Sequence, residues 1–356
     1  MTNFDDFDEF DELVEELDEE FKIEDDETSI VRQEKPSLQD TIASLKTTTE
    51  KRVDKTVLYG LSGVSTSDVA TQVQPIWNGL ATGIRRKILR EMVDLVETDF
   101  EIDYRSFALF ALADGDPRVR TSAIEALWED ESLELMSLLI GIAQKDAVPE
   151  VRAAALSALG RFILLGELGD LPDDETSRAE DAVIAILNND SNDVSVRRRA
   201  LEAISNCTHK IVPQAIQEAY TSEDHDMRVS AIFAMGRSAD ERWEDTILDE
   251  LDSDDPEMRY EAVRASGELS LVEAVPKIAR LLVADDDREI REVAIWSLGE
   301  TGGKEAMRIL ELLAETAEDE EDDVLLEAIE DAISNATLMS GDLFSISLDG
   351  FDDYDD

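Results

Sequence analysis

A short phrase recurs along this chain and constrains its fold more than any other feature. Each copy has an apolar residue followed by arginine, an alanine three residues after that arginine, and a bulkier apolar residue at the fourth. The arginines of the six copies are Arg120, Arg152, Arg197, Arg228, Arg259 and Arg291. They lie 32, 45, 31, 31 and 32 residues apart, a period typical of stacked helical hairpins. The pattern predicts an all-α fold, a right-handed α-solenoid (α-α superhelix) of about seven repeats.

Glycine follows the arginine by eight residues in four of the six copies. These glycines are Gly160, Gly236, Gly267 and Gly299. Because glycine commonly ends a helix, we expect each Val-Arg helix to end near this position and a second helix to follow.

Composition divides the chain into four parts. We predict an acidic, largely disordered segment over 1–52 with a possible amphipathic helix, N-terminal capping helices over 53–113, repeats over 114–338 and an acidic tail over 339–356. The spacing of 45 residues predicts an inserted, turn-rich loop at 166–175, between the two helices of one repeat.

The formal net charge of −53 is concentrated at the two ends. Residues 1–30 hold 15 acidic side chains and one lysine, and residues 314–356 hold 16 acidic side chains and no basic one. Such a field repels phosphate backbones, which argues against direct nucleic-acid binding. It attracts basic surfaces, so we expect a protein partner with a basic surface.

Location and redox state follow from what the sequence lacks. No apolar run is long enough to span a bilayer, which argues against membrane insertion, and the first residues do not resemble a signal peptide. Cys207 is the only cysteine, so no internal disulfide can form. We expect a cytoplasmic protein.

The repeated phrase resembles HEAT repeats, specifically the subtype first associated with phycobilisome lyase subunits (the E/Z type). The resemblance spans roughly residues 75–335, and the copies at Pro256–Glu268 and Ile290–Glu300 match it most clearly. It implies a protein-interaction scaffold or adaptor. An alternative that it also implies is a lyase- or chaperone-like factor for a chromoprotein or another cofactor-bearing protein, although no residue here marks a bilin site.

The six repeated arginines have two interpretations. They can line a ligand-binding face, or they can bind carboxylates and carbonyls of the adjacent repeat and fix the stacking register. We favour the structural ladder, because one such contact per repeat is what a stack requires.

Enzymatic interpretations lack the residues they need. Some HEAT-repeat hydroxylases bind iron through repeated His-Glu pairs, but this chain has only His209 and His225, neither followed by glutamate. No catalytic triad, phosphate-binding loop or calcium loop is visible. The sequence therefore predicts no enzyme activity, no metal and no cofactor.

Apolar residues within the acidic ends are the first candidates for partner binding. In the N-terminal segment their spacing of 3, 4, 3 and 4 lines one face of a short helix. The candidates are Phe7, Phe10, Val14, Leu17 and Phe21 at one end, and Phe344, Phe351 and Tyr354 at the other.

The tryptophans supply one further candidate. Trp243 begins a second helix, and we expect second helices to line the concave face, which makes Trp243 an exposed anchor. Trp128 and Trp296 lie within Val-Arg helices, where we expect them to pack.

Two further hypotheses concern the acidity. The acidity can reflect adaptation to high salt. The scarcity of lysine, 10 residues against 23 arginines, agrees with this hypothesis. Alternatively, the segment from Phe7 to Phe21 can occupy the protein's own groove and inhibit binding.

Overall fold

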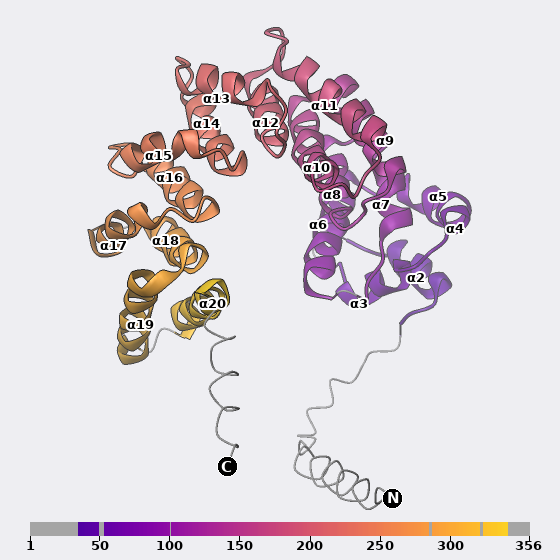
Figure 1. Ribbon diagram of the computed structural model, residues 1–356. Coiled ribbons are helices and arrows are strands. Elements are labelled where there is room, and N and C mark those ends of the chain that lie inside the picture. Colours follow the sequence, from indigo (N-terminus) through magenta and orange to yellow (C-terminus); the bar gives the residue numbers. More distant parts are fainter. Residues whose placement is uncertain (1–34, 50–52, 100, 285–286, 321–322, 341–356) are drawn as a thin grey trace, which may run out of the picture.

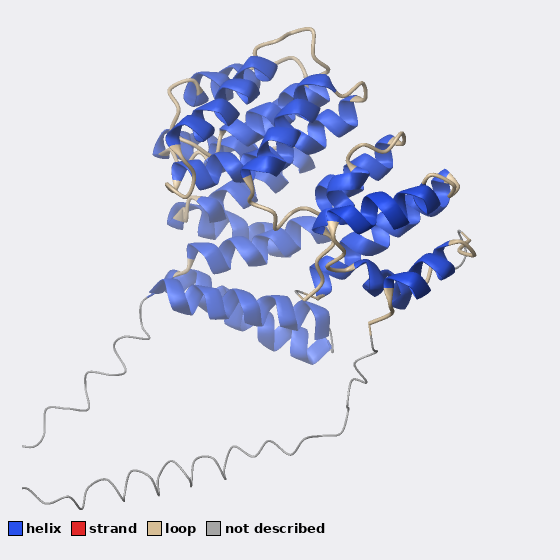
Figure 2. Cartoon of the chain, turned by 90° about the vertical axis from the view of Figure 1, so that its right-hand side faces the viewer, coloured by secondary structure: helices blue, strands red, loops and turns tan. Residues whose placement is uncertain are grey.

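A computed structural model describes residues 35–49, 53–99, 101–284, 287–320 and 323–340. The described part is all-helical and contains no β-strand (Figures 1 and 2). The candidates from Phe7 to Phe21 and from Phe344 to Tyr354 lie outside the described residues.

Short helical elements close the N-terminal end of the stack. They are α2 (Leu38–Leu45), α3 (Lys55–Leu58), η1 (Tyr59–Leu61), α4 (Thr66–Asp68), η2 (Val69–Val73) and α5 (Gln74–Trp77). Helix α2 lies within the segment predicted to be largely disordered, and this part of that prediction is wrong. Thr41 and Leu45 of α2 are buried, and the Thr41 hydroxyl donates to the Val57 carbonyl at 3.2 Å. The burial of these side chains offsets the entropy of ordering this short helix.

Longer helices then form a curved stack of hairpins. After α6 (Thr82–Thr98), the pairs run from α7–α8 to α19–α20. Their bounds are α7 (Arg105–Ala111), α8 (Pro117–Glu125), α9 (Leu133–Lys145), α10 (Pro149–Glu167), α11 (Asp173–Leu187), α12 (Val194–Ile204), α13 (Val212–Tyr220), α14 (His225–Arg237), η3 (Glu241–Trp243), α15 (Glu244–Glu250), α16 (Pro256–Glu268), η4 (Val272–Ala274), α17 (Val275–Ala284), α18 (Arg288–Thr301), α19 (Gly303–Glu320) and α20 (Asp323–Ser340).

The Val-Arg helices form the inner row of this curve. Figure 1 shows α8, α10, α12, α14, α16 and α18 on the concave side, with α9, α11, α13, α15, α17 and α19 outside them. Each Val-Arg helix is also the second member of its hairpin, because among the outer helices α10 packs more on α9 than on α11, and α14 more on α13 than on α15. The expectation that the other helices line the concave face is therefore wrong.

Local sequence explains how the inner helices begin. An aspartate side chain caps most of them; Asp255, for example, accepts the backbone N–H groups of Glu257 and Met258 at 3.0 and 3.4 Å. Pro117, Pro149 and Pro256 occupy first-turn positions, where a missing N–H costs little. The alanines three residues after each arginine are fully buried, as at Ala262 and Ala294.

Three of the repeated glycines lie near the ends of their helices, as predicted. Gly236, Gly267 and Gly299 precede the ends of α14, α16 and α18 by one or two residues, and each faces the next inner helix. Gly160 instead lies inside α10, which continues to Glu167. A Cβ atom at Gly299 would lie 2.9 Å from the Cα of Ala332 in α20. Glycine at these positions also lets neighbouring helices approach more closely than a side chain would allow.

Half of the predicted inserted loop at 166–175 is helical. Helix α10 continues to Glu167 and α11 begins at Asp173, so only 168–172 connect them. This connection joins two successive hairpins rather than the two helices of one. Much of the spacing of 45 residues is taken up by α10 and α11, which are 19 and 15 residues long.

Candidate protein-binding site

The repeated arginines bind the turns of their own hairpins. Arg120 donates to the Asp114 carbonyl at 2.9 Å and Arg152 to the Ala143 carbonyl at 2.8 Å. Three further arginines make the same kind of contact, with these carbonyl partners: Arg197 with Leu187, Arg228 with Ser222 and Arg259 with Ser253. A guanidinium at these carbonyls satisfies acceptors that the end of a helix leaves unpaired.

Among the described residues, hydrogen bonds with the adjacent repeat are seen at Arg120 and Arg152. Arg120 binds both carboxylate oxygens of Asp146, each at 2.8 Å, in the turn before α10. Arg152 donates to Asn192 in the following turn at 2.8 Å. Arg291 is exposed. The ladder thus closes hairpins along most of its length, and Arg120 and Arg152 also join neighbouring repeats.

A cluster of four basic residues on α6, Arg85, Arg86, Lys87 and Arg90, makes similar contacts. Arg86 forms two hydrogen bonds with Asp116, at 2.9 and 2.6 Å, and this pairing holds the pKa of that carboxyl below its usual range. Arg85 lies 3.2 Å from Asp114, which also accepts the indole N–H of Trp77. Two of the cluster's cations therefore join α6 to the turn before α8.

Trp243 is not an exposed anchor. Only 5% of it is exposed, because η3 belongs to the outer side of the stack and its indole packs into the hydrophobic core. Its indole N–H has no hydrogen-bond partner among the described residues. The prediction of an exposed aromatic at this position is wrong.

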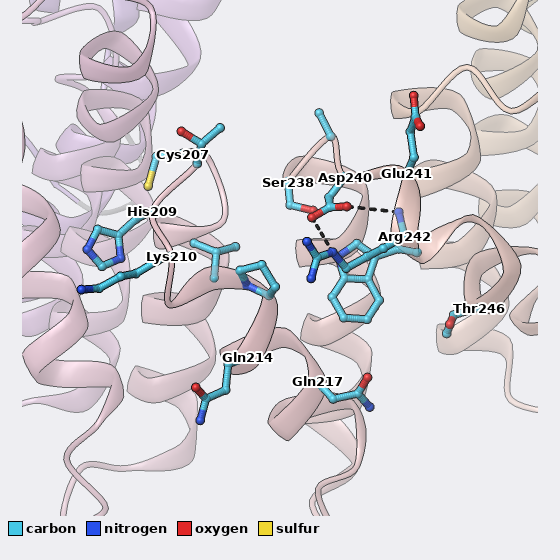
Figure 3. Close-up of a pocket in the computed structure, with 15 residues that line it drawn as sticks. Cys207, His209, Lys210, Gln214, Gln217, Ser238, Asp240, Glu241, Arg242 and Thr246 are labelled. Carbon is cyan, nitrogen blue, oxygen red and sulfur yellow. Dashed lines mark hydrogen bonds and ion pairs between the residues drawn. The ribbon is translucent and has the colours of Figure 1, made fainter.

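A cavity of about 1100 Å³ lies beside Trp243, between the α12–α13 and α14–α15 connections (Figure 3). Arg242 lines this cavity, and its side chain pairs with Asp240 at 2.6 Å. Cys207 also lines it, but burial raises the pKa of this thiol to about 12, so the thiol stays protonated at neutral pH. The cavity therefore offers no reactive nucleophile at this cysteine.

The inner helices carry an accessible strip that the sequence analysis did not identify. It consists of Arg161, Arg199, Phe233, Arg237, Arg264 and Trp296, here called the concave strip. Most of these lie five or nine residues after the repeated arginines, positions that face neither the outer helices nor the hairpin core. Trp296, which we expected to pack, is 40% exposed, and Trp128 is 46% exposed. The sequence contains most of these residues at a regular spacing from the repeated arginines. Their exposure on the concave side can be predicted only once the Val-Arg helices are known to be the inner row.

Aromatic rings and charges alternate along the concave strip. The Arg264 guanidinium lies 3.9 Å from the Phe233 ring centroid, and the Arg237 guanidinium 5.7 Å from it. Arg264 also pairs with Glu261 at 2.8 Å and with Glu268 at 3.0 Å. Stacking and ion pairing together hold these side chains in place across α14 and α16.

Burial affects the charges of this region. It raises the pKa of Glu261 and of Glu268, against the opposing effect of Arg264. One oxygen of Glu268 and one nitrogen of Arg264 are buried without a hydrogen-bond partner among the described residues. The network therefore retains a donor and an acceptor that are not satisfied.

Two pockets lie along the concave strip and share Arg237. The first, of about 380 Å³, is lined by α10, α12 and α14, and the second, of about 340 Å³, by α14, α16 and α18. Leu164, 38% exposed, contributes apolar surface to the first, and Trp296 to the second. Because residues of inner helices alone line both pockets, they open on the concave side.

Metal and membrane sites were also sought in the described residues. No group of three or more His, Cys, Asp or Glu side chains there is placed to hold a metal ion. No helix of this part is long and apolar enough to cross a membrane.

Comparison with known proteins identifies the repeats. The model of the HEAT repeat family matches residues 106–204, 212–299 and 244–334. These matches cover more than half of the chain, so the protein belongs to the HEAT-repeat family. No curated protein matches it significantly.

Similar solved structures are distant. The E. coli protein YIBA is 16% identical, with 72% of this chain and 97% of that chain covered and a TM-score of 0.40. Human deoxyhypusine hydroxylase in complex with glycerol is 18% identical, with 74% of this chain and 96% of that chain covered and a TM-score of 0.33. A chain of the Kap95:Nup1 complex is 12% identical, covering 84% of this chain and 46% of that one, with a TM-score of 0.40. These values are too low to carry a functional argument.

Proposed function

We propose that this protein is a non-enzymatic scaffold that binds a segment of a partner protein along its concave strip. The observation that carries the proposal is Trp296, a large aromatic residue left 40% exposed on the concave face beside the Phe233–Arg264 stack. Tryptophan and arginine are the residues most enriched among those that dominate protein interfaces. HEAT stacks provide extended concave surfaces suited to such partners.

We further propose that the acidic ends bind a basic surface of the same partner, in the cytoplasm. Support comes from sequence alone: carboxylates crowd both ends, with aromatic residues among them. Opposite charges steer the approach, and the aromatic side chains anchor it. We also propose, from the wording of the repeated sequence phrase, that the repeats belong to the lyase-associated HEAT subtype.

The test is a selection of peptides from a random library on the full-length protein, followed by variants. Replacing Trp296 with alanine should weaken the selected peptides by about 2 kcal/mol, the usual loss at a central aromatic anchor. Leu312→Ala is the matched control, because Leu312 is an exposed apolar residue of the outer helix α19. If both variants bind the selected peptides equally well, the concave strip is not the binding site.

The acidic ends need a separate measurement. A protein reduced to residues 35–340 should lose the salt-dependent part of its affinity for a basic partner, because screening acts on exposed charges. If the shortened protein shows the same salt dependence as the full chain, the ends do not contribute to binding. If it binds more tightly, the ends compete for the strip, as the autoinhibition hypothesis requires.

A further inference from the structure

The two pockets of the concave strip differ in charge. Three arginines and one glutamate line the pocket formed by α10, α12 and α14: Arg161, Arg199, Arg237 and Glu202. Three glutamates and one arginine line the other, apart from the shared Arg237: Glu268, Glu289, Glu292 and Arg264. The strip therefore changes from cationic to anionic along its length.

In the cationic pocket the single carboxylate is already neutralised. Glu202 is buried, accepts the Ser230 hydroxyl at 2.6 Å and pairs with both Arg198 and Arg199. Arg199 and Arg237 nevertheless remain 41% and 44% exposed at their side chains. Their accessible charge suits a carboxylate from a partner.

In the anionic pocket two aromatic rings stand beside accessible carboxylates. Trp296 and Tyr260 line it together with Glu289 and Glu292. Burial raises the pKa of Tyr260, and the charges of Glu261, Glu289 and Glu292 raise it further. Glu292 also accepts from Arg288 at 2.6 Å, but half of its side chain is exposed. Aromatic faces with nearby carboxylates favour a cationic side chain.

We propose, building on the function above, that the concave strip binds a partner segment with opposite charges at its two ends. Carboxylates of the segment lie over Arg199 and Arg237, a Lys or Arg side chain lies between Tyr260 and Trp296, and an apolar residue covers Phe233. The charge order along the strip fixes which end of the segment points toward the N-terminal end of the solenoid.

The geometry also sets the spacing of these charges. The pockets are centred on α12 and α16, two steps along the inner row, or roughly 16–20 Å at the usual distance between packed helices. An extended chain advances about 3.3 Å per residue, so the two charged groups lie about five or six residues apart.

The protein's own ends do not satisfy this pattern. Residues 341–356 contain no basic side chain, and Lys22 is the only one within residues 1–30. The C-terminal tail has no cation for the anionic pocket, and the N-terminal segment holds 15 acidic side chains, which that pocket repels, beside its single lysine. We therefore take the occupant to be a segment of another protein.

Fluorescence anisotropy on the full-length protein tests the proposal. One labelled probe carries two aspartates, a five-residue spacer with a central leucine, and two lysines. The control has the same composition with the charges alternating. At low salt the first probe should bind about fivefold more tightly, in the range that exposed ion pairs supply. In 1 M salt, where charges are screened beyond about 3 Å, this difference should disappear.

Two neutralising variants locate the ends of the probe. Arg199→Gln should weaken the binding of a probe whose lysines are replaced by glutamine. It should leave the binding of a probe without aspartates unchanged. Glu292→Gln should do the reverse. Glu305→Gln, at an exposed position of the outer helix α19, is the matched control. Glu292→Gln should keep its melting temperature, since half of that side chain is exposed. Arg199→Gln also removes one of the two cations paired with the buried Glu202 and should lower the melting temperature, so binding is measured well below both transitions.

The outcomes separate this proposal from the function on which it rests. If both probes bind equally, or both variants affect both one-ended probes alike, the strip binds peptides but the charge order is overturned. If no probe binds and Trp296→Ala leaves library peptides unaffected, the proposed binding face itself is wrong. Tighter binding of the first probe, with the crossed pattern of losses, supports the oriented segment.

Discussion

The inner and outer rows of this solenoid are built on different packing rules. Inner helices pack directly on one another, as α10 does on α12 and α16 on α18. Outer helices pack less on one another, and a cavity of about 1100 Å³ opens between the regions of α13 and α15. The inner row carries glycine where helices meet, whereas the outer row carries ordinary apolar stripes. The stack therefore curves toward the row in which small residues let the helices approach most closely.

The largest expected effect comes from the contact that joins two repeats through the inner row. Arg120→Ala leaves the largely buried Asp146 without its cation, which costs about 3 kcal/mol or more. Arg280→Ala in the outer helix α17 removes an exposed arginine and should cost under about 0.5 kcal/mol. Chemical denaturation of both variants measures the difference. Equal losses would show that the inner row has no special role in stability.

Glycine substitutions compare the two rows directly. Gly299→Ala places a Cβ atom 2.9 Å from the backbone of α20 and should destabilise by about 1–3 kcal/mol. Gly141→Ala in the outer helix α9 meets no atom within 4 Å and should stabilise by about 0.5–1 kcal/mol. Thermal melting should therefore move in opposite directions. A stabilising Gly299→Ala would contradict close approach as the reason for this glycine.

Acid should weaken the inner row first. Burial alone would raise the pKa of Asp146, but Arg120 and a backbone N–H outweigh it and lower that pKa. Its contribution is therefore present above the usual carboxyl pKa, near 4, and is lost as pH falls through the lower folded value. Asp146→Asn should lower the free energy of unfolding by about 1–3 kcal/mol at pH 7. Chemical denaturation below pH 4 should show a weaker dependence of stability on pH in this variant than in the unsubstituted protein.

Asp252 provides the control for this pH dependence. Lys277 lowers the pKa of Asp252 from the outer helix α17, yet 60% of the aspartate side chain is exposed. Solvent screening should limit the effect of Asp252→Asn to a few tenths of a kcal/mol. An acid dependence as large as that of Asp146 would show that burial does not separate the two sites.

The smallest expected effect concerns a link between two inner helices. His225 Nε2 lies 2.6 Å from Asp255, which raises the pKa of the imidazole. The stabilisation is complete below the ordinary histidine pKa and is lost as pH rises through the folded value. Because His225 is exposed, His225→Gln should change stability by only a few tenths of a kcal/mol at pH 6 and less at pH 8. A larger loss at pH 8 would contradict this sign.

The candidate site could be predicted only in part. Periodicity marked the buried alanines and the arginines beside them, because burial repeats with each hairpin. Trp243 and Trp296 were assigned the wrong way round, since their exposure depends on which row faces inward. The pattern of a single helix shows which of its faces is buried, but not on which side of the stack the helix lies.

Sequence alone determined that this chain is a stack of helical hairpins, because a repeated apolar pattern can bury itself only against copies of the same unit. It also located the acidic ends and the hairpin-closing arginines. Tertiary structure decided the direction of curvature, the role of the glycines and the concave strip. These depend on distances between helices far apart in the sequence, such as the approach of Gly299 to Ala332, and local sequence patterns do not set such distances.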